Sequence, residues 1–200
     1  MVAIITGDII NSRETAPQEW LNELKAVLNL FGNEPKSWEI YRGDSFQLEV
    51  SPKEALKAAF LIKASIKQFK HNDVRLAIGI GEKRYASEKI TESNGSAFVN
   101  SGLCFEQLKK HTLAVKSPSE TFDYQLNLML ELALLVMDQW KPATSTILKY
   151  TLTYPTLNQE AIAQKLQKSQ SNISEGLKRG GYDELSKLLA YYESQIQSLC

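Results

Sequence analysis

The chain has 200 residues, of which 43% are hydrophobic and 23% charged, with 10 glycines and 6 prolines. This is the composition of an ordinary globular protein, and it excludes collagen-like, low-complexity and wholly disordered chains. Two cysteines and two histidines are too few for a structural zinc site built from Cys and His clusters. The formal net charge of zero argues against a generally basic nucleic-acid-binding protein.

The N-terminal residues 1–8 lack a basic region and reach an aspartate after a short apolar run, which predicts no signal peptide. The most apolar stretch, 126–140, is interrupted by Asn127, Glu131 and Asp138. These polar residues predict a buried helix rather than a membrane span. We therefore expect a cytoplasmic protein without a membrane partner.

The first 117 residues alternate between strand and helix patterns. Short β-branched and apolar runs predict strands at 2–6, 37–41, 46–50, 74–80 and 112–115. Apolar residues spaced three and four apart predict helices at 17–31, from 52, and at 96–110, and the polar segment 82–95 is expected to be a mobile loop. The order β-α-β-β-α-β-α-β predicts an α+β fold with helices packed on one face of the sheet.

From Pro118 onward every pattern is helical. Helices are predicted at 120–140, from Pro142, near 157–160, from about 169, and at 182–199. We expect three parts: an α+β domain at 1–117, a linking and dimerisation helix at 118–141, and a helical domain at 142–200. Residues 141–200 carry 7 basic and 5 acidic residues, against 16 and 18 before them, which weakly favours nucleic acid at the C-terminal end.

Asp8 and Asp44 form the first candidate site. Asp8 is expected at the end of the first strand and Asp44 at the tip of a hairpin, so their carboxylates converge if that strand pairs beside the hairpin. Two close carboxylates repel unless a cation or proton lies between them, and Mg²⁺ binds one or two carboxylates together with phosphates. Glycines that allow close backbone approach lie nearby, at Gly7, Gly43, Gly79 and Gly81. The alternative is a pair of acids that serve only in turns.

Four segments in this half resemble class III nucleotide cyclases and the related palm domains with a GGDEF hairpin. They are Ile-Thr-Gly-Asp-Ile at 5–9, Arg-Gly-Asp-Ser-Phe at 42–46, Leu-Ala-Ile-Gly-Ile-Gly at 76–81 and Ala-Phe-Val-Asn-Ser at 97–101. With its helical C-terminal part, the whole chain looks most like the bacterial SatD family. The resemblance implies a cyclase-like, ferredoxin-like sheet over 1–116, and Mg²⁺ or Mn²⁺ with a nucleotide as the cofactor. It places the metal on Asp8 and Asp44 and the nucleotide on Gly7, Arg42, Gly43 and Asn100.

Three departures from the cyclase pattern argue against turnover. Cys104 stands four residues after Asn100, where the family has its catalytic Arg, and a thiol cannot neutralise a transferring phosphoryl group. Ile40 replaces the Lys of adenine-selective cyclases, and Arg42 replaces the second Gly of a GGDEF hairpin. We therefore expect no catalytic residue, and we expect Cys104 to be a buried small residue.

Residues 157–177 form the second candidate site, a helix-turn-helix. Ala163 supplies the small residue where two steeply crossing helices touch, and apolar residues at 162, 166, 173 and 177 face a core. Gln167 stands in the turn, where this motif usually has Gly. Short polar side chains at the start of the second helix suit base edges and its basic residues suit phosphates. The predicted DNA contacts are Ser169, Gln170, Ser171, Asn172, Ser174, Lys178 and Arg179. The alternative is a helical module that binds protein or only packs.

Together these patterns predict a DNA-binding transcriptional regulator whose first domain senses a nucleotide or another phosphorylated ligand. The alternatives are a metal-dependent nucleotidyl cyclase or phosphotransferase, and a protein-interaction adaptor in which both sites are vestigial. A homodimer is expected through the helices at 120–140 and 182–199, because helix-turn-helix proteins usually pair on two half-sites. These helices also hold more apolar surface than a small terminal module can bury.

Overall fold

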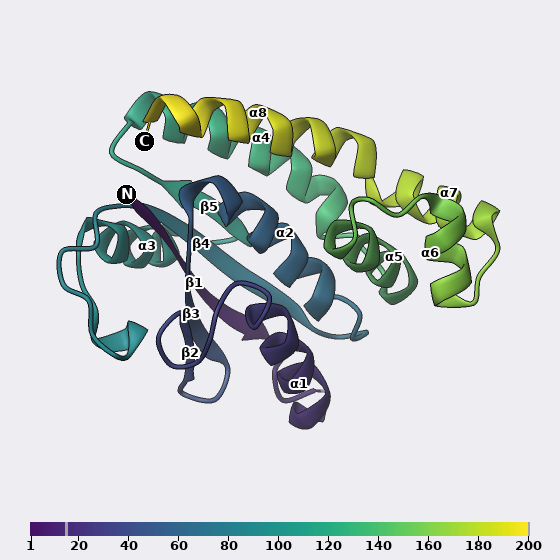
Figure 1. The fold of residues 1–200 in the computed structure, drawn as a ribbon, viewed down its shortest axis with the longest axis horizontal. Helices are drawn as coiled ribbons and strands as arrows, with labels where there is room; N and C mark the ends of the chain where they lie inside the picture. The colour runs from purple at the N-terminus through teal and green to yellow at the C-terminus, as the bar shows by residue number, and fades with distance from the viewer. Residues whose placement is uncertain (15, 200) are drawn as a thin grey trace.

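The computed structural model describes residues 1–14 and 16–199. Its sheet has five strands: β1 (Val2–Ile10), β2 (Trp38–Tyr41), β3 (Ser45–Val50), β4 (Asp73–Gly81) and β5 (Leu113–Lys116). The strand order is β2-β3-β1-β4-β5, with β1 antiparallel to both neighbours and β5 parallel to β4. The predicted α+β class, followed by an all-helical C-terminal region, is confirmed (Figure 1).

Helices cover both faces of this sheet. The core beneath α1 (Pro17–Leu28) and α2 (Ala55–Ile66) includes Ile5 and Ile9 of β1, whereas Ile4, which precedes Ile5 and points to the other face of the sheet, packs toward α3 (Ser96–Gln107). A Cβ on Gly79 of β4 would lie 2.1 Å from the Ser101 backbone nitrogen, so α3 approaches the strand more closely than a side chain permits. The expectation of helices on one face is therefore wrong for α3, because the β4 glycines make room for it.

The segment 82–95, expected as a mobile loop, is held to the rest of the structure at several points. It contains a short turn of 3₁₀ helix, η2 (Ile90–Glu92), whose Ile90 side chain is fully buried. The Ile90 amide donates to the Pro35 carbonyl oxygen at 2.9 Å, and Tyr85 pairs with Asn94 through backbone hydrogen bonds. The segment is thus part of the fold beside α3.

The helix α2 lies between the sheet and the C-terminal helices. It follows η1 (Pro52–Glu54), and all of its side chains except Lys57 are buried. The sheet covers one side, while α5 (Pro142–Thr153) and α8 (Tyr182–Leu199) cover the other, so one hydrophobic core runs from the sheet into the helical region. Tyr192 of α8 donates its hydroxyl hydrogen to the Pro52 carbonyl oxygen at 2.5 Å.

A buried charge network ties α4 (Glu120–Met137) to this core. The Lys63 side chain in α2 is fully buried, and its Nζ lies 2.8 Å from carboxylate oxygens of both Asp73 and Asp138. Lys63 also donates to the Thr112 hydroxyl, and Lys67 pairs with Asp73 at 2.9 Å. Because Asp138 caps the C-terminal end of α4, the network fixes that end against β4 and β5.

The last three helices follow α5. They are α6 (Gln159–Leu166), α7 (Gln170–Gly180) and α8, which runs back alongside α4 (Figure 1). Trp140 Nε1 donates to the Gly180 carbonyl oxygen at 3.1 Å, which joins the end of α7 to the end of α4. Across the described residues, no helix is long and apolar enough to cross a membrane.

Candidate functional site

The segment predicted to form a helix-turn-helix folds as two helices, α6 and α7, joined by the turn 167–169. Asn158 caps α6 by accepting from the Ala161 amide at 2.9 Å, and Ser169 caps α7 by accepting from the Asn172 amide at 3.2 Å. Gln167 adopts a left-handed conformation with φ 53°, the backbone geometry that explains why this motif usually has Gly here. The Lys168 amide donates to the Ala163 carbonyl oxygen at 2.9 Å and completes the turn.

Two glycines that the sequence reasoning missed hold α7 against α5. A Cβ on Gly176 would lie 2.4 Å from Ile147 Cδ1, and one on Gly180 would lie 2.8 Å from Leu148 Cδ1. Glycines four residues apart share one helix face, so α7 can lie close to α5 along that face. The Gly-x-x-x-Gly spacing within a polar helix was the available signal. Ile173 and Leu177 bury the rest of this side of α7, as predicted.

The opposite side of α7 carries the predicted DNA contacts. Its exposed residues include Gln170, Ser171, Asn172, Ser174, Lys178 and Arg179. Ser169 is also exposed, but its hydroxyl oxygen accepts the capping hydrogen bond.

Charges on α7 set what this surface can attract. Arg179 pairs with Glu175 one turn earlier at 3.3 Å, an acid on the exposed side that the sequence reasoning did not weigh. Lys178 has no ion-pair partner within the described ranges. The exposed surface of α6, the turn and α7 also carries Lys165 and Lys168, with Glu160 opposing. The balance is mildly positive, and the first amides of α7 add a partial positive charge.

Asp8 lies within β1 rather than at its end, because β1 continues to Ile10, which pairs with Asp73 of β4. Its carboxylate is held by Arg75, directly opposite on β4: Nε donates to Oδ1 at 2.9 Å and Nη2 donates to Oδ2. The hydrogen bonds that Arg75 donates to Asp8 raise the pKa of Arg75, against the effect of burial. The guanidinium also lies over the Phe105 ring, 5.1 Å from its centroid. Asp8 is therefore already neutralised by a bidentate partner.

Asp44 is close to β1 along the backbone, since its carbonyl oxygen accepts from the Ile9 amide at 3.1 Å. Its carboxylate accepts instead from the Ser12 hydroxyl at 2.8 Å. No group of three or more His, Cys, Asp or Glu side chains within residues 1–14 and 16–199 is arranged to hold a metal ion. The arrangement does not fit the cation that the cyclase resemblance implies, because a metal at Asp8 would have to displace Arg75.

The residues expected to hold a nucleotide divide into two pairs. A Cβ on Gly7 would lie 2.5 Å from Phe46 Cζ, and Asn100 Nδ2 donates to the Ile80 carbonyl oxygen at 2.8 Å, so both serve packing. Arg42 and Gly43 form the hairpin tip, and both have a positive φ. No described atom lies within 4 Å of where a Cβ on Gly43 would be, so the backbone at the tip is accessible.

A shallow pocket of about 420 Å³ adjoins this tip and is lined by Glu39, Tyr41, Arg42, Gln47 and Thr91. Burial raises the pKa of Tyr41, with Asp8 adding to the shift and Arg42 opposing it. The tyrosine hydroxyl therefore keeps its proton and can donate a hydrogen bond in the pocket.

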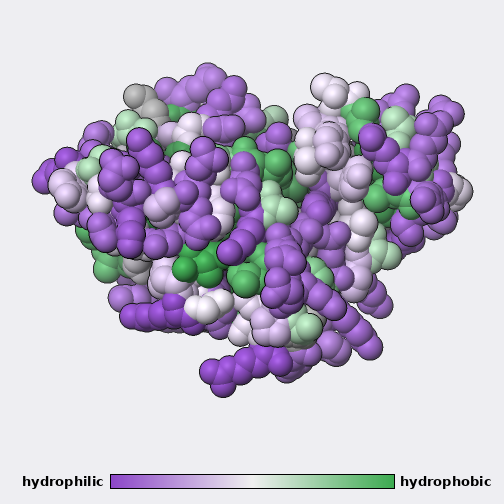
Figure 2. Space-filling view, turned by 60° about the horizontal axis from the view of Figure 1, so that its bottom comes forward, coloured by the Kyte–Doolittle hydropathy of each residue, from purple (hydrophilic) through white to green (hydrophobic). Residues whose placement is uncertain are grey.

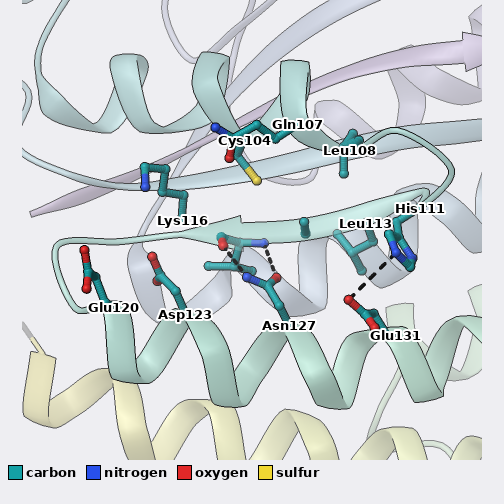
Figure 3. A pocket seen from close by; sticks show the side chains of 12 residues that line it. Cys104, Gln107, Leu108, His111, Leu113, Lys116, Glu120, Asp123, Asn127 and Glu131 are labelled. Atoms are coloured by element: carbon teal, nitrogen blue, oxygen red, sulfur yellow. Dashed lines mark hydrogen bonds and ion pairs between the residues drawn. The ribbon is translucent and has the colours of Figure 1, made fainter.

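A second pocket, of about 360 Å³, lies between α3, β5 and α4 (Figure 3). Asn127 makes two 2.8 Å hydrogen bonds to the backbone of Val115 and so covers the free edge of β5. Burial raises the pKa of the Cys104 thiol to about 12, with Asp123 adding and Lys116 opposing. A neutral, buried thiol is no nucleophile, and Cys104 is buried as predicted.

In comparisons with known proteins, this chain matches no family model, no curated protein and no solved structure.

Proposed function

We propose that this chain is a transcriptional regulator that binds DNA through α6 and α7. The observation that carries the proposal is the build of α7: its N-terminus is capped, one side is locked onto α5, and the other side is polar and exposed. In this arrangement Gln170 and Asn172 contact base edges, because they lie in the first turn of the helix that enters the major groove. Lys178 and Arg179 contact phosphates.

The charge of the α6–α7 surface determines how strongly it binds DNA without regard to sequence. The exposed cations of α6, the turn and α7 are Lys165, Lys168, Lys178 and Arg179. Each phosphate contact contributes about 0.9 to the slope of log affinity against log salt concentration, so one motif accounts for a slope of at most about 4. Arg179 must also exchange its Glu175 partner for a phosphate. The proposal therefore predicts weak non-specific binding and greater reliance on base contacts.

Fluorescence anisotropy with labelled genomic fragments at several salt concentrations tests the proposal. Lys178→Ala should weaken binding to all fragments alike and lower the salt slope by about one. Lys89→Ala is the matched control, since Lys89 is an exposed lysine in the loop 82–95, far from α7 in the fold (Figure 1). Wild-type protein that shows no salt-sensitive binding, or a Lys89→Ala effect as large as that of Lys178→Ala, would refute the proposal.

For the sheet half, we propose a phosphorylated ligand, such as a nucleotide, at the pocket beside the hairpin tip. The support is that Arg42 and Gly43 remain open beside the Tyr41 hydroxyl, while the other expected residues serve packing. A thermal-shift panel of nucleotides should raise the melting temperature of wild type but not of Arg42→Ala. Because Arg75 already neutralises Asp8, the shift should be the same with Mg²⁺ and with a chelator. Formation of a cyclic nucleotide would instead favour the enzyme alternative.

A further inference from the structure

The helix α4 exposes a stripe of large apolar side chains. Tyr124, Leu128, Leu132 and Leu135 follow one another at spacings of three or four residues along one helix face, and Val136 lies beside them, one turn after Leu132. Their exposed fractions are 73% for Tyr124, 49% for Leu128, 61% for Leu132, 71% for Leu135 and 40% for Val136. No other helix in the described part of the chain exposes more than two large apolar side chains. The face of the molecule shown in Figure 2 is mostly hydrophilic, with smaller apolar patches near its centre. A concentration of this kind marks an interaction surface.

The other face of α4 is already used within the chain. Its buried residues are spaced four apart, with a last step of three, and all belong to the main core: Phe122, Leu126, Leu130, Leu134 and Met137. The helix is therefore apolar on two faces, which explains why its sequence has the pattern of a fully buried helix. One of these two faces has no cover within residues 1–14 and 16–199.

The size of the stripe indicates a protein partner. From Tyr124 to Val136 it is about 18 Å long, at 1.5 Å per residue. Its exposed area is on the order of 500 Å², and a stable interface takes about 800 Å² from each partner. A groove of about 670 Å³ between α4 and α8 continues the surface and is lined by Leu132 and Val136 but not by the other three stripe residues. A small ligand in that groove would leave Tyr124, Leu128 and Leu135 exposed.

The two flanks of the stripe carry opposite charges. On the β5 side, Glu131 lines the pocket shown in Figure 3, with its carboxylate 3.8 Å from His111 Nε2. On the α8 side, the groove is lined by three cations, Lys178, Arg179 and Lys187, and by one acid, Glu184, so this flank is positive. Lys187 has no ion-pair partner among the described residues. A two-fold axis along α4 brings unlike flanks of two copies together. A two-fold axis across α4 brings like flanks together, which like charges disfavour.

We propose that a second copy of this chain covers the stripe, with the two α4 helices side by side in the same direction. Glu131 then faces Lys187 of the partner subunit across the interface. The arrangement also places both α7 helices at the same end of the dimer, since the end of α7 is joined to the end of α4. This last consequence rests on the proposed function, because there one DNA duplex can contact both recognition helices.

Sedimentation equilibrium of the full chain tests the interface. Wild type should be a dimer at a protein concentration on the order of tens of micromolar, because an interface of this size gives a dissociation constant below that concentration. Leu135→Glu should raise the dimer dissociation constant by about 100-fold or more, because each dimer would bury two carboxylates. Leu30→Glu is the matched control, since Leu30 is 57% exposed away from α4, and it should remain dimeric. Leu128→Ser provides a milder second variant, and circular dichroism checks that each variant is folded.

Cysteine cross-linking tests the direction of the helices, in a Cys200→Ser background. Two parallel helices on a two-fold axis bring each central residue to its own counterpart, so Leu128→Cys and Leu135→Cys should each form a disulfide-linked dimer, whereas Leu30→Cys should not. Cross-linking at only one of the two positions would overturn the parallel arrangement. A wild-type monomer, or a Leu135→Glu dimer as tight as wild type, would overturn the interface. A dimer that binds no DNA would refute the proposed function and leave this inference standing.

Discussion

Replacing Asp73 by Asn should destabilise the protein more than any single surface substitution, because two buried lysines depend on its carboxylate. Lys63 is fully buried, and Lys67 has a side chain only 9% exposed. After the substitution, Lys63 retains Asp138 and Thr112, whereas the acceptor that remains for Lys67 among the described atoms is the Asp138 carbonyl oxygen, at 2.9 Å. The variant therefore leaves more positive charge than negative in a buried site.

The expected cost is about 3 kcal/mol of the free energy of unfolding. Breaking a buried ion pair by removing one partner costs about 3–5 kcal/mol. The lower end applies because the Asp73 side chain is 17% exposed and Asp138 still faces Lys63. For a chain of this length, about 3 kcal/mol corresponds to a fall in melting temperature of about 6–12 °C.

Urea unfolding followed by circular dichroism measures this cost. Glu193→Gln is the matched control, since it removes a carboxylate from the exposed Lys53–Glu193 pair, whose side chains are 58% and 44% exposed. That pair should contribute about 1 kcal/mol or less. If Asp73→Asn costs no more than Glu193→Gln, the network does not fasten α4 to the sheet as described.

Three further predictions follow from local geometry. Gly79→Ala should lower the free energy of unfolding, measured in urea, by about 3 kcal/mol or more, because its Cβ would lie 2.1 Å from the backbone of α3. Gly102→Ala, within α3, is the control: a Cβ there has open space among the described atoms, so the variant should gain about 1 kcal/mol. Burial raises the pKa of Cys104 from 9.0 to about 12, so its contribution to stability is complete below pH 9 and is lost as the pH rises from 9 toward 12. The free energy of unfolding should therefore fall less between pH 8.5 and about 10.5 in Cys104→Ala than in wild type, and equal slopes would contradict this account. Ser169→Ala should lower the free energy of unfolding by about 1 kcal/mol through loss of the α7 cap, as measured by thermal denaturation, and an unchanged value would mean that this hydrogen bond does not stabilise α7.

Local patterns were sufficient to predict most elements. The last helix is found at the predicted residues 182–199, and β4 extends one residue beyond each predicted end, because regular hydrophobic spacing identifies such segments without tertiary information. The caps at Asn158 and Ser169 likewise define the starts of α6 and α7 locally. By contrast, β1 was predicted four residues too short. The polar Thr6-Gly7-Asp8 segment has the pattern of a strand end, and only pairing with the long β4 extends the strand to Ile10.

The candidate metal site shows what local patterns cannot give. The sequence predicted a cation at Asp8 because no partner for its carboxylate lies nearby along the chain. The actual partner depends on strand register, which brings together residues far apart in the sequence. The register of β1 with β4 places Arg75 directly across from Asp8. An arginine within the otherwise apolar segment 74–80 was the available signal. The burial of α2 on all sides could likewise not be predicted from local patterns. The helices that cover its outer face, α5 and α8, begin 75 or more residues later in the sequence.

Selection of binding sequences from a random DNA library, with purified full-length protein, tests the central claim most directly. Wild type should enrich a defined sequence, and Asn172→Ala should change the preferred base at one position, because Asn172 lies in the first exposed turn of α7. Lys178→Ala should enrich the same sequence as wild type with weaker binding. Failure of wild type to enrich any sequence, or identical preferences for wild type and Asn172→Ala, would contradict the assignment of α7 as a recognition helix.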